Sequence, residues 1–126
     1  LIPSMSAEEN ILTPVWATNI LDWKMRLEWI YKIIPEALEL KDRPSTSLSG
    51  GQQKLIALSR ALMVGSKLLL LDEPSEGIAP ALAKRIIDIL NDLKKEGVTT
   101  LIAESNAGHY KGMLDKSFVI ERGEIN

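Results

Sequence analysis

The sequence predicts a fold of the α/β class, and three observations support that prediction. A leucine-rich run ends in two adjacent carboxylates over residues 68–73, and a second apolar run covers residues 98–104. Between the two runs, apolar residues recur at the spacing of a helix. A strand, a helix and a strand in this order are expected to form a right-handed parallel crossover, the basic unit of α/β folds.

The composition excludes several classes of function. Of the 126 residues, 45% are hydrophobic and 25% are charged, which is ordinary for a globular protein. The formal net charge of -2 provides no general basic field, so no nucleic-acid partner is expected. The chain has no cysteine and one histidine, His109, which excludes disulfides and a multi-histidine metal site. Because the sequence begins at Leu1 rather than methionine, we expect a piece of a longer protein.

The first third of the chain predicts helices. Residues 6–9, "SAEE", fit the capping box that starts a helix. One predicted helical face follows at steps of three and four, formed by Trp16, Ile20, Trp23, Leu27, Ile30 and Ile34. The tryptophans could form a binding surface, but such stripes are more often core, and core is expected here. Pro35 and residues 41–47 interrupt the pattern and predict loop.

A glycine-rich turn precedes the next predicted helix. Its buried face consists of Leu55, Leu58, Ala61 and Leu62. Ser49, Gly50 and Gly51 stand at its start, where free N–H groups and the helix dipole favour an anion. Glycine lets a phosphate approach the backbone, and the Ser49 hydroxyl adds a donor. Taken alone, the stretch favours the simpler alternative of an N-cap with a flexible turn.

The leucine run at 68–71 is typical of a central parallel strand that is buried on both faces. Asp72 and Glu73 follow at its carboxyl end, where α/β sheets collect ligands. Strand neighbours point to opposite sides, so the two acids can have different roles. One can reach a magnesium ion, usually through water, and the other can orient or deprotonate an attacking water. The alternative, a strand ending in a solvated turn, is weaker for an adjacent pair.

The remaining elements continue the α/β pattern. A helical face is predicted from Leu82, Ile86, Ile89, Leu90 and Leu93. Gly97 is a candidate C-cap, and residues 98–104 are the second strand. A short polar helix should follow, and "ERGE" at 121–124 predicts a hairpin turn between two strands.

Two motifs resemble one protein family, the ABC-type ATPases. "LSGGQQK" at 48–54 is similar to the family's signature motif, and "LLLLDEP" at 68–74 to its Walker B strand and catalytic glutamate. The resemblance extends over almost the whole chain and implies the C-terminal half of the nucleotide-binding domain. Residues 1–66 would form a helical subdomain that includes the signature helix. Residues 67–126 would form the second half of a RecA-like P-loop NTPase core, with parallel strands, flanking helices and a C-terminal β-hairpin.

The resemblance also implies roles for individual residues. The residues expected to bind ATP are Leu48, Ser49, Gly50, Gly51, Gln52 and Asp72. The signature residues would contact the γ-phosphate of an ATP held mainly by a second subunit. Asp72 would hold magnesium through water, and Glu73 would act as general base. Residues 75–79 would form the D-loop between two subunits.

The sequence departs from the family pattern at three places. It contains no G-x-x-x-x-G-K-[ST] motif, so the Walker A loop is expected upstream of Leu1. Ala79 stands where the family usually has the D-loop aspartate. Ser105 stands where the family has a switch histidine, and it is expected to replace that catalytic residue. The interaction with the γ-phosphate would then be absent or bridged by water. His109 comes four residues later and is expected on the surface of a helix.

The expected function is ATP hydrolysis at a dimer interface that drives transmembrane transport. "DEPSEGIAP" and "AESN" resemble the ATPases of branched-chain amino acid importers, so amino acids are the expected cargo. The expected partners are a second ATPase subunit, identical or different, and transmembrane permease subunits, on the cytoplasmic face of the cell membrane. Without a Walker A loop, the chain alone is expected to be inactive. The alternatives are a soluble ABC ATPase without a transport role and a non-catalytic interaction fragment of the same fold.

Overall fold

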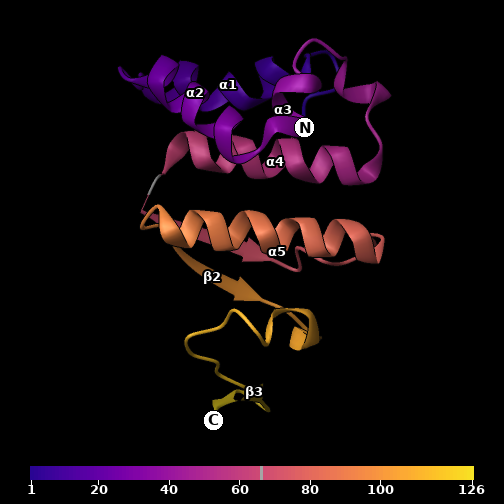
Figure 1. Ribbon diagram of the computed structural model, residues 1–126, viewed down its shortest axis with the longest axis vertical. Helices are drawn as coiled ribbons and strands as arrows, with labels where there is room; N and C mark the ends of the chain where they lie inside the picture. Colours follow the sequence, from indigo (N-terminus) through magenta and orange to yellow (C-terminus); the bar gives the residue numbers. More distant parts are fainter. Residues whose placement is uncertain (66) are drawn as a thin grey trace.

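The computed structural model describes residues 1–65 and 67–126, with a helical layer above a smaller α/β layer (Figure 1). The helical layer contains α1 (Ala7–Thr18), α2 (Trp23–Ile33), α3 (Pro35–Glu39), the 3₁₀ turn η1 (Ser45–Ser47) and α4 (Gly50–Val64). The α/β layer contains β1 (Leu68–Asp72), α5 (Pro80–Lys95), β2 (Thr99–Ala103), the 3₁₀ turn η2 (Ala107–Tyr110), β3 (Ile120–Glu121) and β4 (Glu124–Ile125). This order of elements confirms the predicted α/β class.

The start of α1 confirms the predicted capping box. The Ser6 hydroxyl accepts a hydrogen bond from the Glu9 N–H at 3.1 Å, and the Glu9 carboxylate accepts one from the Ser6 N–H at 2.8 Å. Each side chain therefore satisfies a backbone donor that the first helical turn leaves without a partner. Residues 6–9 therefore determine where α1 begins.

The predicted helical face over residues 16–34 is wrong at its middle. Asn19 ends α1 in the left-handed conformation, with φ at 52°, and α2 begins only at Trp23. Asparagine adopts this conformation more readily than most residues, and a pattern of apolar spacing does not detect it. As a result Trp16 is exposed, whereas Trp23 is half-buried and packs against the core. The expectation that the tryptophans belong to the core is therefore wrong for Trp16.

Pro35 begins a helix rather than a loop. It occupies the first position of α3, where the missing N–H and the fixed φ of proline cost nothing. The segment after α3 is irregular as predicted, apart from η1. The predicted inner face of α4 is confirmed, because Leu55, Leu58 and Leu62 are buried, and Ala61 is half-buried.

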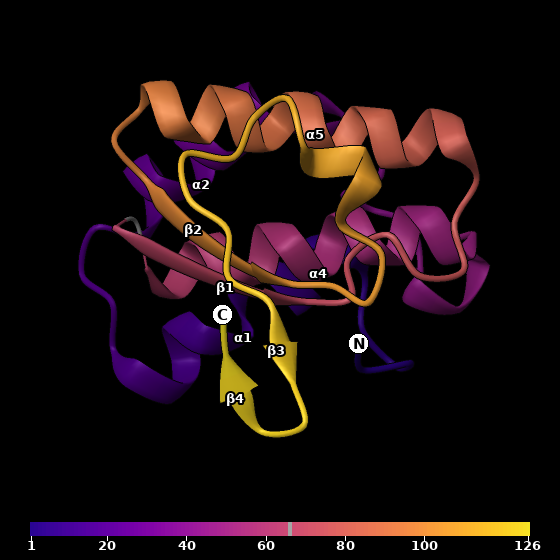
Figure 2. The ribbon, with the colours of Figure 1, turned by 90° about the horizontal axis from the view of Figure 1, so that it is seen from below.

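The two long strands form the predicted parallel pair, with α5 as the crossover. Leu68 lies opposite Thr99 and Asp72 lies opposite Ala103, so all five residues of each strand are in register. Leu69, on the inner face, is 3% exposed and joins the core formed with α4 and α5. Figure 2 shows the strands in front of α4, with α5 running along one side of them.

The other face of this sheet is open, which corrects the prediction of a strand buried on both faces. Leu68, Leu70 and Leu101 all point to this face and are 56%, 64% and 61% exposed. A run of leucines indicates two apolar faces, but the described residues cover only one of them. The open face begins with these leucines and ends with Asp72 and Ala103.

The end of α5 and the C-terminal hairpin follow the predictions. The Gly97 N–H donates to the Lys94 carbonyl at 3.1 Å and the Val98 N–H to the Leu93 carbonyl at 2.9 Å, the two bonds of a glycine-terminated helix end. Gly97 has φ at 83°, which glycine adopts without strain. In the hairpin, the two central turn residues, 122 and 123, both have positive φ, as a tight two-residue turn requires.

The two layers are joined by a common core and by an ion pair. Buried side chains of α4 and α5 belong to one continuous cluster. The guanidinium of Arg85 on α5 binds the carboxylate of Glu36 on α3 through two hydrogen bonds, one of them 3.0 Å between Nη2 and Oε2. The division into subdomains at residues 66 and 67 stays a prediction. Among the described residues, none of the helices has the length and apolar character needed to span a membrane.

Candidate functional site

The start of α4 carries a second capping box. The Gln52 N–H donates to the Ser49 hydroxyl at 3.2 Å, and the Ser49 N–H donates to Gln52 Oε1 at 2.9 Å. The N–H groups of Gly50 and Gly51 lie in the first turn, where a helix offers them no acceptor of its own. Ser49 and Gly50 are exposed, so the turn is both an N-cap and a surface that an anion can reach.

The two glycines of this turn have different surroundings. A Cβ on Gly51 would collide with Cδ2 of Leu82, at the start of α5, whereas a Cβ on Gly50 would meet no atom within 4 Å. Gly51 therefore allows α4 and α5 to approach closely. The sequence assigned both glycines the same role, because the packing partner of Gly51 lies 31 positions away in the chain. Leu48 is buried, so its side chain anchors the turn in the core.

Lys54 connects α4 to the loop that follows β1. Its Nζ donates to the carbonyl of Glu76 at 2.6 Å and to that of Pro74 at 3.3 Å. This contact was not predicted, because a lysine in the second turn of a helix is ordinarily a solvated residue. The start of α4, the carboxyl end of β1 and the start of α5 lie at the same side of the molecule (Figures 1 and 2).

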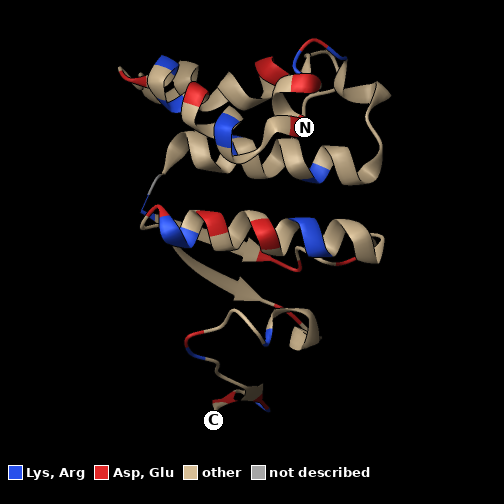
Figure 3. Cartoon of the chain, in the orientation of Figure 1, with Lys and Arg blue, Asp and Glu red and all other residues tan. Residues whose placement is uncertain are grey.

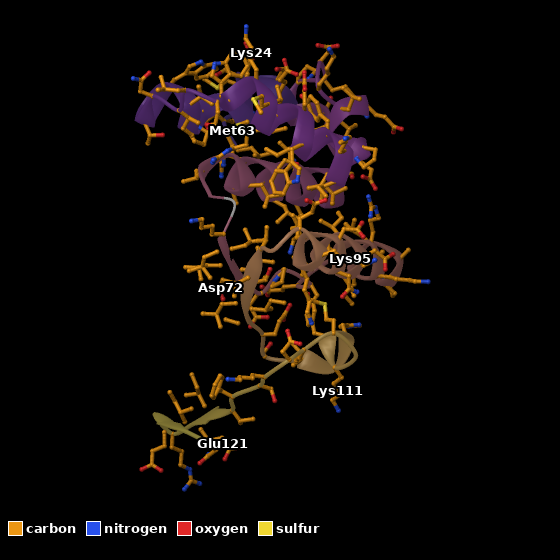
Figure 4. All side chains as sticks on the ribbon, turned by 60° about the vertical axis from the view of Figure 1, so that its left-hand side comes forward. Lys24, Met63, Asp72, Lys95, Lys111 and Glu121 are labelled. Carbon is orange, nitrogen blue, oxygen red and sulfur yellow. The ribbon has the colours of Figure 1, made fainter. Side chains whose placement is uncertain are left out.

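Asp72 and Glu73 leave β1 in different conformations. Asp72 is the last strand residue and lies exposed on the open face of the sheet. Figure 4 labels Asp72 beside the strands, and Figure 3 shows acidic residues in red where the strands end. Glu73 has φ at 46°, while its N–H still donates to the Ala103 carbonyl at 2.8 Å. Strand alternation, which predicted opposite directions for the two acids, therefore does not apply to Glu73.

Two carboxylates and two serines join the ends of β1 and β2 in a crossed arrangement. Glu73 Oε1 accepts a hydrogen bond from the Ser105 N–H at 3.0 Å, and Glu73 Oε2 accepts one from the Ser105 hydroxyl at 3.3 Å. In return, Glu104 Oε1 accepts hydrogen bonds from the Ser75 N–H at 3.0 Å and from the Ser75 hydroxyl at 2.6 Å. The structure thus brings together Glu73 and Ser105, the two predicted catalytic residues. Glu104 and Ser75 were not singled out for catalysis, since their partnership depends on the register of the strands.

Tyr110 on η2 is the fifth member of this cluster. Its hydroxyl donates to Glu104 Oε1 at 3.2 Å, and the side chain is almost fully buried. Burial raises the pKa of Tyr110, so its hydroxyl remains a donor. Burial alone would raise the pKa of Glu104 as well, but hydrogen bonds from Ser75 outweigh it and leave this pKa below its usual value. The interaction with Glu104 raises the pKa of Glu73.

His109 and Ala79, which were not predicted to be catalytic, lie outside this cluster of carboxylates, serines and Tyr110. His109 is exposed on η2, as predicted for a surface position. Ala79 is the N-cap of α5 and provides no side-chain oxygen for the helix start.

A family model described as "ABC transporter" matches residues 1–76, which include the turn before α4 and the carboxylates after β1. The chain belongs to the ABC transporter family. Among curated relatives of this ABC chain, the high-affinity branched-chain amino acid transport ATP-binding protein BraG of Pseudomonas aeruginosa is 36% identical over 121 residues. That match covers 96% of this chain and 52% of the relative. The probable branched-chain amino acid transport ATP-binding protein LivG of Methanocaldococcus jannaschii is 39% identical, over 79% of this chain and 39% of the relative.

Solved ABC structures share the fold of this chain. A crystal structure of an ATP-binding cassette of an ABC transporter in its ADP conformation has a TM-score of 0.87 and 29% identity, and the match covers 98% of this ABC chain and 54% of that one. A nucleotide-free ATP-binding cassette gives a TM-score of 0.82 at 30% identity, with the same coverage. The described elements are therefore part of the RecA-like cassette fold of ABC ATPases. The chain spans about half the length of the proteins that it matches.

Proposed function

We propose that this chain is part of an ATP-hydrolysing subunit of a transporter and that Glu73 is its general base. The main supporting observation is the placement of Glu73 at the carboxyl end of a parallel strand, with both carboxylate oxygens hydrogen-bonded to Ser105. Ligands of α/β sheets collect at this edge. A carboxylate held in a fixed direction is suited to orient and deprotonate a water molecule.

ATP is proposed to bind between two such subunits. The N–H groups of Gly50 and Gly51, the Ser49 hydroxyl and the positive end of the α4 dipole would receive the γ-phosphate, and Gln52 would hold the turn in shape. Leu48 would contribute through its backbone, because its side chain is buried. The Walker A loop, which this sequence lacks, would come from the rest of the subunit.

Asp72 fits the magnesium site that the ABC family implies. Magnesium usually keeps several waters and uses one or two carboxylates together with phosphate oxygens. Asp72 provides one exposed carboxylate, and no cluster of three or more ligating side chains occurs among the described residues. The ion would neutralise phosphate charge, and Asp72 would hold it through water.

Ser105 is proposed to act with Glu73. Because both Ser105 donors are directed at Glu73, the serine would hold the carboxylate in place while the nucleotide is absent. A contact between Ser105 and the γ-phosphate would require the hydroxyl to turn away from Glu73.

The transport role is proposed from the relatives. Both BraG and LivG are named for branched-chain amino acid transport, whereas a relative from Sulfolobus acidocaldarius at 29% identity is named for xylose/arabinose import. Amino acids are therefore the proposed cargo, and permease subunits are the proposed partners at the inner face of the membrane. The complete subunit, reconstituted with its permease, should hydrolyse ATP faster when branched-chain amino acids are present. Stimulation by pentoses alone would contradict the proposed cargo.

The shared-site mechanism is tested by trapping the dimer. Glu73→Gln keeps the shape of the side chain and removes the base, so the complete subunit should accumulate as an ATP-bound dimer in size-exclusion chromatography with Mg-ATP. Adding Gly50→Asp should dissolve this dimer by placing an anion against the γ-phosphate. Gly50 suits this test better than Gly51, because a side chain at Gly50 meets open space and one at Gly51 meets Leu82. A monomeric Glu73→Gln subunit, or a double variant that dimerises equally well, would contradict the mechanism.

A further inference from the structure

The loop after β1 holds Glu73 in a conformation that needs support. A non-glycine residue in the left-handed region is strained and persists only where the surroundings enforce it. Glu73 is one of three such residues among those described. Its own N–H is fixed to the Ala103 carbonyl, which holds the loop on the strand side.

On the far side of Glu73, the support comes from Glu104. One oxygen of Glu104 accepts three hydrogen bonds, two from Ser75 and one from Tyr110. Ser75 lies two residues after Glu73, so the bonds from its N–H and its hydroxyl fix the loop just beyond the strained residue. The backbone at Glu73 is therefore held at two points: its own N–H binds Ala103, and Ser75, two residues later, binds Glu104.

The position of Glu104 is in turn fixed by a buried residue. Tyr110 is 1% exposed, and its hydroxyl donates to Glu104. A buried hydroxyl without a partner is destabilising, so this bond ties Glu104 to the core. The chain of contacts runs from the core through Tyr110, Glu104 and Ser75 to the loop that carries Glu73.

We propose that Glu104 is a positioning residue for Glu73, acting through Ser75 and held in place by Tyr110. The inference rests on the proposed role of Glu73 as general base. Glu104 touches neither nucleotide nor water in this role. It fixes the loop from which the Glu73 side chain extends, and misplacement of a catalytic group by about 1 Å can cost ~10²-fold in rate.

The test uses the complete subunit and measures kcat and KM for ATP. Glu104→Gln keeps the volume of the side chain and one acceptor oxygen but removes the negative charge that strengthens the three hydrogen bonds, so kcat should fall several-fold. KM should change less than twofold, because the nucleotide contacts are intact. Tyr110→Phe and Ser75→Ala should lower kcat several-fold, and Ser75→Thr, which keeps the hydroxyl, should restore it.

The matched control is Tyr31→Phe. The Tyr31 hydroxyl donates to Glu8 at 2.5 Å, so this variant also removes a tyrosine–glutamate hydrogen bond, but within the helical layer. Its kcat should equal that of the unmodified subunit. If Tyr31→Phe and Tyr110→Phe lower kcat equally, the Tyr110 bond acts through general stability and the proposal is overturned.

A second comparison tests the positioning role of Glu104 separately from the general-base role of Glu73. In the Glu73→Gln background, Glu104→Gln should cause no additional loss of hydrolysis, because no base is left to position. If Glu73→Gln removes hydrolysis while Glu104→Gln alone leaves kcat unchanged, the positioning role is wrong and the role of Glu73 stands. If Glu73→Gln retains full activity, the proposed function itself fails. Should Glu104→Gln not fold, Tyr110→Phe, which is nearly isosteric, provides the same decision.

Discussion

The ion pair between Arg85 and Glu36 gives a quantitative prediction for the contact between the two layers. The pair has two hydrogen bonds, and its side chains are 30% and 32% exposed. Fully exposed pairs contribute about 0.2–1 kcal/mol, and paired geometry with partial burial raises this value. We therefore expect a coupling of about 1 kcal/mol between the two side chains.

The measurement is a double-mutant cycle on the purified chain. Urea unfolding of the unmodified chain, Glu36→Gln, Arg85→Met and the double variant gives the coupling as the departure from additivity. Lys94 and Asp115 form the control pair, because they are 50% and 77% exposed and join through one 2.8 Å contact. Their coupling should be at most about 0.5 kcal/mol.

The coupling between Arg85 and Glu36 should depend on pH because it requires the ionised carboxylate of Glu36. Hydrogen bonding to Arg85 lowers the pKa of Glu36 in the folded chain. A group with a lowered folded pKa contributes stability above its unfolded pKa and loses that contribution as the pH falls through the folded value. The coupling should therefore be complete at pH 7 and lost in acid, once the pH has fallen below the folded pKa of Glu36. A coupling below about 0.3 kcal/mol at pH 7, or one that persists in acid, would refute the reasoning.

Three other predictions concern single positions. Ala79→Asn should stabilise the chain by about 0.5–2 kcal/mol in urea unfolding, because Ala79 has the extended backbone of an N-cap and gives α5 no side-chain acceptor. An unchanged free energy of unfolding would mean that the asparagine side chain does not accept a hydrogen bond from the first turn of α5. Ser105→Ala in the complete subunit should lower kcat several-fold, since it removes one of the two donors to Glu73, and an unchanged kcat would show that the backbone N–H suffices. The isolated chain should not bind Mg-ATP, because the loop that cradles the phosphates is absent from the sequence; micromolar binding in calorimetry would contradict this.

Local signals in the sequence predicted much of the fold. The capping box before α1, the glycine at the end of α5 and the hairpin turn are each set by neighbouring residues, and each is present. The break at Asn19 was missed because apolar residues continue at helical spacing across it. The open face of β1 was missed because periodicity shows which residues are apolar and not what covers them.

The candidate site was predicted as motifs and not as contacts. Glu73 was singled out by its position after the first strand and by the family resemblance, and Ser105 by the resemblance alone. The strand register brings them together. The contacts from Lys54 to Pro74 and from Glu104 to Ser75 join residues 20 and 29 positions apart, so they depend on how α4 and the strands pack. The strained backbone at Glu73 was also beyond prediction, because its preceding leucines favour an extended chain.

The open face of the sheet makes the stability of this chain depend on its surroundings. Burying a leucine completely is worth about 1.5–3 kcal/mol, so covering the exposed parts of Leu68, Leu70 and Leu101 would add roughly 3–5 kcal/mol. A polypeptide that binds this face binds the folded chain and not the unfolded one, and it stabilises the fold by mass action. The midpoint of thermal unfolding should then rise with the concentration of that polypeptide. The midpoint measured on the isolated chain would be the lowest value in that series.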